Sequence, residues 1–221
     1  MVKLNKSSLP LHLEELLEKK SNPALYRDGE VFERLVDESH HKCYICEDDK
    51  VRLIAEHIRP HKGDKGLEYD WRNILPACDH CNSVKGQKYD NILNCLENDP
   101  EEYIAISMPI DDLKMSVKVS VILPAMEAEE TKNLLDLVHN ITNTAQRREY
   151  TIKLRRKAMK ELMRLKENLV NYGAEQDIQR KEERYQSIVK MMDRSSPFAA
   201  IKRNMIRSKP IYMKEFGEYL S

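Results

Sequence analysis

The sequence lacks any apolar run of about 18 residues, and this absence excludes an ordinary membrane-spanning helix. Its N-terminus, MVKLNKSSLP, has no apolar core of the kind found in secretory signals. It also contains no internal repeat and no low-complexity segment. With 41% apolar and 33% charged residues among 221, we expect a globular protein that acts in the cytoplasm.

Net charge is absent too, because 37 basic residues balance 37 acidic ones. The total therefore gives no indication of a nucleic-acid partner, but the distribution is uneven. Residues 147–166 hold nine Lys or Arg and two Glu, residues 200–214 hold five basic residues and no acidic one, and residues 28–49 hold eight Asp or Glu. Such runs are commonly solvated helix faces, and beside a nucleic-acid site they become candidate phosphate contacts.

Apolar periodicity predicts mainly helical structure at both ends of the chain. In residues 1–42, the Ser8-Leu9-Pro10 segment predicts a capped helix over 11–17 that ends at 21–23, and a second helix follows over 28–39. Residues 125–221 are predicted to be a helical region. It has one apolar face with Leu134, Val138, Ile141 and Ala145, and another with Ile152, Met159, Leu162 and Leu169.

Within this helical region the sequence also predicts the breaks. Tyr172-Gly173 ends a helix, and residues 175–193 form the next one, with Ile178, Tyr185, Ile188 and Met192 on its apolar face. Ser195-Ser196-Pro197 is predicted to cap a last helix.

Residues 96–124 are predicted to be a β-hairpin. One strand is expected over 103–106 and the other over 113–123, where Leu113, Met115, Val117, Val119 and Val121 alternate with polar residues. The remaining segment, 43–95, is rich in turn formers and too short to bury a large apolar core, so we expect a metal to stabilise it.

Four of the five cysteines occur in two pairs with a two-residue spacer, Cys43/Cys46 and Cys78/Cys81, separated by 31 residues. In a cytoplasmic protein such pairs favour a metal over disulfides. Two such pairs complete a tetrahedral Zn²⁺ site of four thiolates, which has no open position and supports folding rather than catalysis. Cys95 is expected to be a free or buried thiol.

The residues between and after these pairs resemble the HNH, or ββα-metal, endonucleases. The resemblance rests on Glu56-His57-Ile-Arg-Pro60, on Asn73 in Trp-Arg-Asn-Ile-Leu, and on Cys78-x-x-Cys81-Asn82-x-x-Lys85, which occur in the family's order. It covers about residues 43–90. It implies a zinc-stapled ββα module in a mainly α-helical α+β chain with one extra hairpin, and an enzyme that hydrolyses phosphodiester bonds of nucleic acid.

By this resemblance, His57 is the general base that activates water, and Glu56 with the Asn82 side-chain oxygen holds a catalytic divalent ion. Asn73 shapes the loop and orients the base. Glu replaces the commoner Asp at 56 and Asn replaces His at 82, and oxygen donors favour Mg²⁺ or Mn²⁺ over a softer ion. Arg59, His61 and Lys85 are candidate nucleic-acid contacts.

Each of these residues has an ordinary structural explanation when it is taken alone. Glu-His is a common end of a surface strand, and Asn73 and Asn82 suit caps and turns. Their order between two cysteine pairs favours the site. The class that remains open beside a nuclease is a non-catalytic zinc module that binds proteins or nucleic acid. A nuclease that works alone would need a sequence-reading domain, which only residues 147–166 could contain.

The layout is similar to the nuclease subunit of Septu-type anti-phage defence systems, including the retron-associated version. This impression rests on Lys42–Glu47, Glu56–His61, Asp70–Asn73 and a helical C-terminal half with Ser196-Pro-Phe198. It implies an ABC-like ATPase as a protein partner that restrains the nuclease until infection. We expect DNA as the substrate, with RNA such as tRNA as the alternative. Helices after residue 125 would then serve as docking or DNA-facing surface, or they form an ordinary helical domain.

Overall fold

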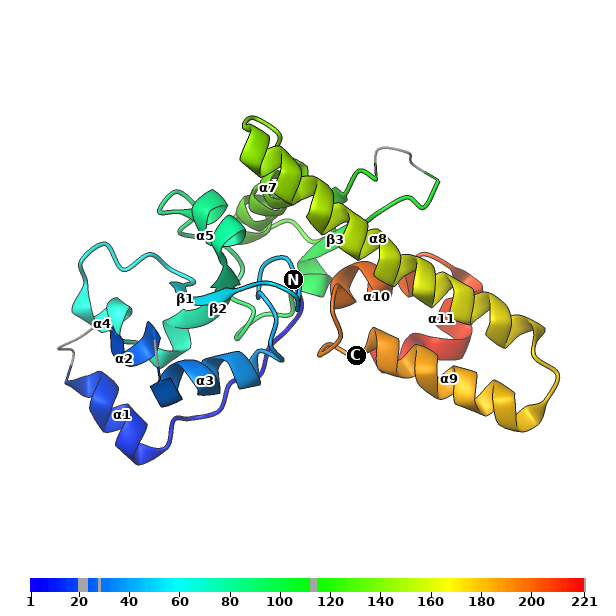
Figure 1. The fold of residues 1–221 in the computed structure, drawn as a ribbon, viewed down its shortest axis with the longest axis horizontal. Coiled ribbons are helices and arrows are strands. Elements are labelled where there is room, and N and C mark those ends of the chain that lie inside the picture. Colours follow the sequence, from blue (N-terminus) through cyan, green and yellow to red (C-terminus); the bar gives the residue numbers. More distant parts are fainter. Residues whose placement is uncertain (20–23, 28, 112–114, 221) are drawn as a thin grey trace.

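The computed structural model describes residues 1–19, 24–27, 29–111 and 115–220, and it has the α+β architecture expected from the sequence. Two small antiparallel hairpins lie among helices (Figure 1). In chain order the elements are α1 (Leu11–Glu18), α2 (Ala24–Arg27), α3 (Gly29–Glu38), β1 (Leu53–His57), α4 (Lys65–Glu68), the 3₁₀ helix η1 (Trp71–Asn73), β2 (Ile74–Cys78), α5 (Asp79–Lys85), α6 (Pro100–Tyr103), β3 (Ile104–Ser107), β4 (Lys118–Val121), α7 (Met126–Asn140), α8 (Ala145–Ala174), α9 (Ile178–Met192), α10 (Ala199–Arg207), α11 (Pro210–Phe216) and the 3₁₀ helix η2 (Gly217–Leu220).

The first hairpin and the helix after it form a ββα unit. Strands β1 and β2 pair antiparallel, with Leu53 opposite Cys78 and His57 opposite Ile74. All five residues of β2 are buried, as expected for the inner strand of a small module. Helix α5 follows β2 without a loop and ends at Gly86, whose φ of 49° and ψ of −147° suit a residue without Cβ. The ββα order that the sequence predicts is therefore present.

The second hairpin is shorter than predicted. Strand β4 covers only Lys118–Val121 and pairs with β3 so that Ile106 faces Val119. Val117 and Val119 are buried, which agrees with the predicted alternation, but Met115 has a positive φ of 51° and lies outside the strand. Leu113 lies outside the described residues. A β-strand needs extended backbone, so the turn at Met115 limits the ladder.

The N-terminal helices follow the prediction closely. Helix α1 buries Leu13 and Leu17, and α3 buries Val31 and Leu35. No side chain caps α1: the backbone carbonyl of Pro10 accepts from Leu13 and Glu14 instead. The predicted stop at 21–23 lies outside the described residues.

The predicted apolar face that continues from Val138 through Ile141 to Ala145 is wrong. Helix α7 ends at Asn140, and Ile141 has an extended ψ of 131°. Side chains of α8 satisfy the free carbonyls at this end, because Arg155 donates to His139 O at 2.7 Å and Thr151 donates to Ile141 O at 2.9 Å. The two helices therefore meet at a sharp turn that α8 itself closes.

Three other boundaries in the C-terminal half differ from the sequence prediction. Helix α8 continues through Gly173 to Ala174, so the predicted break comes later. Ile178 is the first residue of α9 and 87% exposed, not part of its buried face. Ser195 and Ser196 do not cap α10: its N-cap is Phe198, which has a φ of 52°, is buried, and donates its N–H to Glu47 O at 3.2 Å.

Helix α8 joins two of the three apolar clusters in the described chain. Its first half contributes Leu154 and Leu162 to a main cluster shared with both hairpins and α7. Its second half contributes Leu165 and Leu169 to a cluster with α9, α10 and α11. A further cluster lies between α1, α3 and Ile74 of β2. Figure 1 shows that α8 begins beside α5 and α7 and ends where the chain turns back into the antiparallel helix α9. No described helix has the length and apolarity to cross a membrane.

A buried arginine anchors α10 between distant segments. Arg203 is 1% exposed and donates to Glu101 Oε2 at 2.7 Å, to Leu220 O at 2.8 Å and to Tyr219 O at 3.0 Å. Glu101 also pairs with Arg207 at 2.6 Å. A buried charge of this kind is tolerated because each of the three guanidinium nitrogens has an acceptor.

Arg203→Ala should destabilise the fold by about 1–3 kcal/mol, because it removes the donor to Tyr219 O and leaves Arg207 as the closest remaining partner of Glu101. Urea unfolding followed by circular dichroism measures the change. Arg180→Ala on the exposed side of α9 is the matched control and should leave the midpoint unchanged. Equal midpoints for the two variants would contradict the anchoring role.

Candidate metal centre and active site

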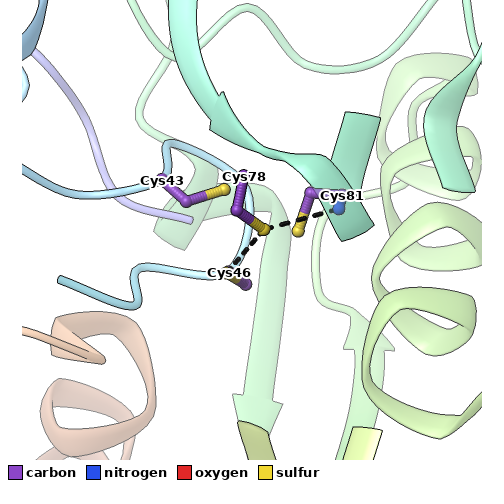
Figure 2. A group of neighbouring side chains, drawn as sticks. All are labelled: Cys43, Cys46, Cys78 and Cys81. Carbon is purple, nitrogen blue, oxygen red and sulfur yellow. Dashed lines mark hydrogen bonds between the residues drawn. The ribbon is translucent and has the colours of Figure 1, made fainter. Parts of the chain in front are cut away.

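The four paired cysteines converge on one point (Figure 2). Their sulfur atoms all lie within 4.8 Å of one another, and all four residues are buried. The Sγ atoms of Cys46 and Cys78 are 3.9 Å apart. A tetrahedral ion with Zn–S bonds of about 2.3 Å separates its sulfurs by roughly 3.8 Å, so the cluster fits zinc. Cys95 is buried elsewhere and is not among these ligands.

Three different elements bring the sulfurs together. Cys43 and Cys46 lie in the turn before β1, Cys78 ends β2, and Cys81 lies in the first turn of α5. The backbone N–H of Tyr44 donates to Pro76 O at 3.0 Å and so fixes the first turn against β2. The Cys81 N–H approaches Cys78 Sγ at 3.5 Å, which caps α5 with a metal-site sulfur. The hairpin, the turn and the helix start are thus joined at the cluster.

The directions of the pKa shifts of Cys46, Cys78 and Cys81 agree with a cation site among these thiols. Hydrogen bonds from the other three cysteines lower the pKa of Cys78. Cys46 has a raised pKa, chiefly through its hydrogen bonds with Cys43 and Cys78, and burial raises that of Cys81. One thiolate is therefore stabilised at the expense of its neighbours. Only a positive ion shared by all four sulfurs can stabilise four thiolates at once.

Helix α8 contacts the metal cluster directly. The Tyr150 hydroxyl donates to Cys78 Sγ at 3.1 Å, and its ring stacks on His80 at 4.2 Å between centroids. His80 in turn bonds Val138 O of α7 through Nε2 at 3.0 Å. Sequence reasoning missed Tyr150, because nothing in its neighbourhood on the chain distinguishes it from other helix tyrosines.

His57 ends β1 with a defined tautomer. Its Nε2 lies 2.9 Å from the backbone carbonyl of Glu68, which can only accept, so Nε2 carries the proton and Nδ1 keeps its lone pair. The ring meets Tyr26 edge-on at 5.4 Å and lies 4.9 Å from the ring of His61. Burial lowers the pKa of His57, although the Glu68 carbonyl opposes this shift. The imidazole is therefore kept neutral and able to accept a proton.

Glu56 lies on the other face of β1, as adjacent strand residues do. It is 7% exposed, its Oε1 accepts from Lys85 Nζ at 2.9 Å, and its Oε2 accepts from the Tyr44 hydroxyl at 3.0 Å. Burial raises the pKa of Glu56, and Lys85 opposes the shift. Tyr44 lies inside the first cysteine pair, where the sequence offers no indication of this contact.

Lys85 is fully buried. Its Nζ, which donates to Glu56, also donates to the backbone carbonyl oxygen of His57 at 2.7 Å. In this arrangement it stabilises the end of β1 and is not open to a phosphate. Asn82 is half-buried one turn earlier on α5, and residues three apart share a helix face. Asn82 therefore lies on the side of α5 that meets Glu56. No hydrogen bond of its side-chain amide is found within the described part of the chain.

Asn73 fastens the loop between the strands of the first hairpin. Its Oδ1 accepts from Arg59 N, and its Nδ2 donates to Arg59 O and Leu67 O, each at 2.9 Å. Leu67 precedes Glu68, whose carbonyl holds His57. Asn73 thus helps to position the His57 ring indirectly, because it fixes the loop that carries the Glu68 carbonyl.

The polar residues near His57 differ in their access to solvent. Arg59 is exposed. The His61 side chain is 34% exposed, and its Nδ1 lies 4.0 Å from Oε2 of Glu68. The buried Glu68 carboxylate also pairs with Lys65 at 2.6 Å. Glu68 was missed in the sequence, because its importance comes from the loop that folds it against β1.

Comparison with known proteins assigns the module. A family model described as HNH endonuclease matches residues 43–94. The Septu protein PtuB of Bacillus thuringiensis is 32% identical over 77 residues, which are 32% of this chain and 30% of that protein. The match thus covers about a third of the relative's length. No solved structure matches this chain significantly. The chain therefore carries an HNH endonuclease domain, and the expected resemblance to the Septu nuclease is confirmed.

Cys78→Ser should remove the bound zinc and lower the melting temperature, because the ligand set loses one of its four sulfurs. The metal content of the purified protein and its thermal unfolding measure both effects. Cys95→Ser is the matched control and should retain one zinc per chain, since its sulfur lies outside the cluster. Loss of zinc from the control as well would contradict the assignment of the ligands.

Lys85→Met should destabilise the chain by about 3–5 kcal/mol, because it leaves the Glu56 charge buried and unpaired. The double variant Glu56→Gln/Lys85→Met should be clearly more stable than the single one, since both charges are then absent. Urea unfolding of the two single variants and the double variant measures the coupling. If the losses of unfolding free energy in the two single variants simply added up in the double variant, the two charges would not be coupled, and the proposed ion pair would be wrong.

Proposed function

We propose that the chain is a metal-dependent endonuclease that hydrolyses phosphodiester bonds of nucleic acid, with DNA as the first candidate, in an anti-phage defence system. The observation that carries this proposal is the HNH domain with a neutral, oriented histidine at the end of β1. A zinc module that served only to bind other molecules would need the four sulfurs, but not this oriented histidine.

His57 is the general base in this proposal. Its Nδ1 accepts the proton of the attacking water, while Nε2–H stays bonded to the Glu68 carbonyl, which stabilises the imidazolium that forms. Asn73 is a positioning residue, because it fixes the loop that presents this carbonyl. His61 and Arg59 lie near enough in the chain and in space to contact the substrate phosphates.

Glu56 and Asn82 would hold a hard divalent ion, Mg²⁺ or Mn²⁺, because a carboxylate and an amide oxygen are suitable donors. Such an ion supplies charge neutralisation at the phosphate and at the leaving oxygen. The residue types fit, but the Lys85 ammonium 2.9 Å from Glu56 already neutralises this carboxylate. Binding therefore requires Glu56 to share its oxygen or Lys85 to move. The four cysteines hold the structural Zn²⁺.

The substrate class follows from the chemistry of the site only in part. Water attack on a phosphate is indifferent to the sugar, so RNA, including tRNA, is the second candidate substrate. The described site offers few groups that could read a base edge, and we therefore propose that specificity comes from a partner. Resemblance to the Septu nuclease supports an ABC-like ATPase in this role and action in the cytoplasm. Helices α7–α11 offer its docking surface.

His57→Ala should lower cleavage by about 10²- to 10⁴-fold, the usual contribution of a general base, and should leave the zinc content unchanged. Purified protein with its ATPase partner, Mg²⁺, and either plasmid DNA or total RNA provides the assay. His12→Ala is the matched control, because His12 is 65% exposed on α1, apart from the site.

Three outcomes distinguish the candidates. Cleavage of plasmid alone or of RNA alone identifies the substrate. Undiminished cleavage by His57→Ala with loss in His61→Ala would move the role of base to the neighbouring ring. Absence of any cleavage under all conditions, with zinc retained, would favour the non-catalytic zinc module.

A further inference from the structure

A basic groove lies beside the zinc cluster, on a surface that the proposed reaction does not use. The segment leading into β1, the junction of β2 with α5, and one face of α8 enclose about 470 Å³. Cys78 forms part of the wall, and Tyr150, which bonds its sulfur, forms another part. We call this hollow the α8 groove.

The rim of the α8 groove is positively charged. Five cationic side chains line it, against two carboxylates: Lys50, Arg52, Lys153, Arg156 and Lys157 against Asp48 and Asp79. Asp48 is only 2% exposed and is already paired with Lys157 at 2.6 Å. Much of the positive charge is therefore left for an anion from outside.

Lys50, Arg52 and Arg156 are the most available cations of the rim, and the two arginines are the better phosphate ligands. Both are exposed, and within the described residues no carboxylate lies at ion-pair distance from either guanidinium. Lys153 pairs with Glu149, but both side chains are about two-thirds exposed, and such surface pairs are weak. Arginine binds phosphate through its planar fork and remains charged at all working pH values.

The floor of the α8 groove is apolar and aromatic. Val51, Leu154 and the half-buried ring of Tyr150 form it, beneath the cationic rim. An acidic protein segment would need only the charges. A nucleic-acid strand combines regularly spaced phosphates with flat, largely apolar sugar and base surfaces, and sites for such strands pair basic rims with aromatic floors. The groove thus suits a nucleic-acid strand better.

The position of the α8 groove relates it to the candidate active site. Arg52 directly precedes β1, and His57 ends it, so the two are five residues apart on extended chain, or roughly 17 Å. Successive phosphates of one duplex strand rise about 3.4 Å along the axis. Residues five apart on a strand face opposite sides, so a duplex that contacts both must pass around the edge of the hairpin and spans roughly five or more nucleotides between them.

We propose that the α8 groove is a second nucleic-acid-binding site, which holds the substrate backbone roughly five or more nucleotides from the bond that is cut. This inference rests on the proposed function for the identity of the ligand. Its contacts are Arg52 and Arg156 with phosphates, and Tyr150 with the strand between them. The groove provides affinity for the backbone and no sequence discrimination, because none of these groups reads a base edge.

Binding of a fluorescently labelled 20-nucleotide strand and of its duplex, followed by anisotropy, tests the inference. The zinc-loaded full chain is used in a His57→Ala background, so that no cleavage occurs. Arg52→Glu/Arg156→Glu should weaken binding tenfold or more. The slope of log affinity against log salt should fall by about 1.4–1.8, since two phosphate contacts are lost.

Lys166→Glu/Arg180→Glu is the matched control, with the same change in charge at exposed positions outside the groove. It should retain binding within about twofold, since non-contacting charges act only through the screened field. Arg52→Gln/Arg156→Gln should give an intermediate loss, and this milder variant serves if the charge reversal fails to fold. Zinc content and circular dichroism check the fold of each variant.

Binding by both groove variants as tight as that of the control would overturn the inference. So would unchanged nucleic-acid binding with a specific loss of the ATPase partner, which would assign the groove to a protein. These results leave the proposed function standing, because cleavage by the chain with intact His57 is measured separately. Conversely, weakened binding in the groove variants without any cleavage by the chain would support the groove and defeat the proposed nuclease activity.

Discussion

The convergence of four cysteine sulfurs on one point is the constraint on which the rest of this module depends. The turn before β1, the last residue of β2 and the first turn of α5 carry these sulfurs, and all four cysteines are part of the main apolar cluster. A shared cation turns four mutually unfavourable thiolates into one strong cross-link. That cross-link fixes where α5 starts relative to the hairpin. The contacts of Lys85 with Glu56 and with the His57 carbonyl follow from this placement.

Buried charge is the second feature of the module, and each charge has its partner. Lys85 and Tyr44 satisfy Glu56, and the Glu68 carbonyl fixes the His57 ring. In a medium of low dielectric these contacts hold both side chains firmly, but they also compete with any ligand that arrives. A divalent ion at Glu56 must contend with an ammonium that already lies there.

Helix α8 connects this module to the helical half of the chain. It donates a hydrogen bond to the Cys78 sulfur at one end and packs with α9, α10 and α11 at the other. The 30 residues of α8 thus form one continuous element between the cysteine cluster and the helical half. The same helix supplies most of the basic rim of the α8 groove. Docking of a partner on the helical half and retention of nucleic acid could therefore be linked through one element.

The sequence by itself determined what depends on local chemistry. Cysteine spacing sufficed for the metal cluster, because two residues between thiolates are a property of the chain alone. Period-two and helical patterns located β4, α1 and α3 within a few residues, since each needs only one apolar face. Only the tertiary structure decided which groups meet across the fold. Lys85 turned inward to Glu56, Phe198 replaced the expected serine cap because Glu47 accepts its N–H, and α7 stopped at Asn140 because α8 side chains bind its carbonyls. Such contacts join residues far apart in sequence, and no local pattern carries the information about which of many polar groups will be brought together.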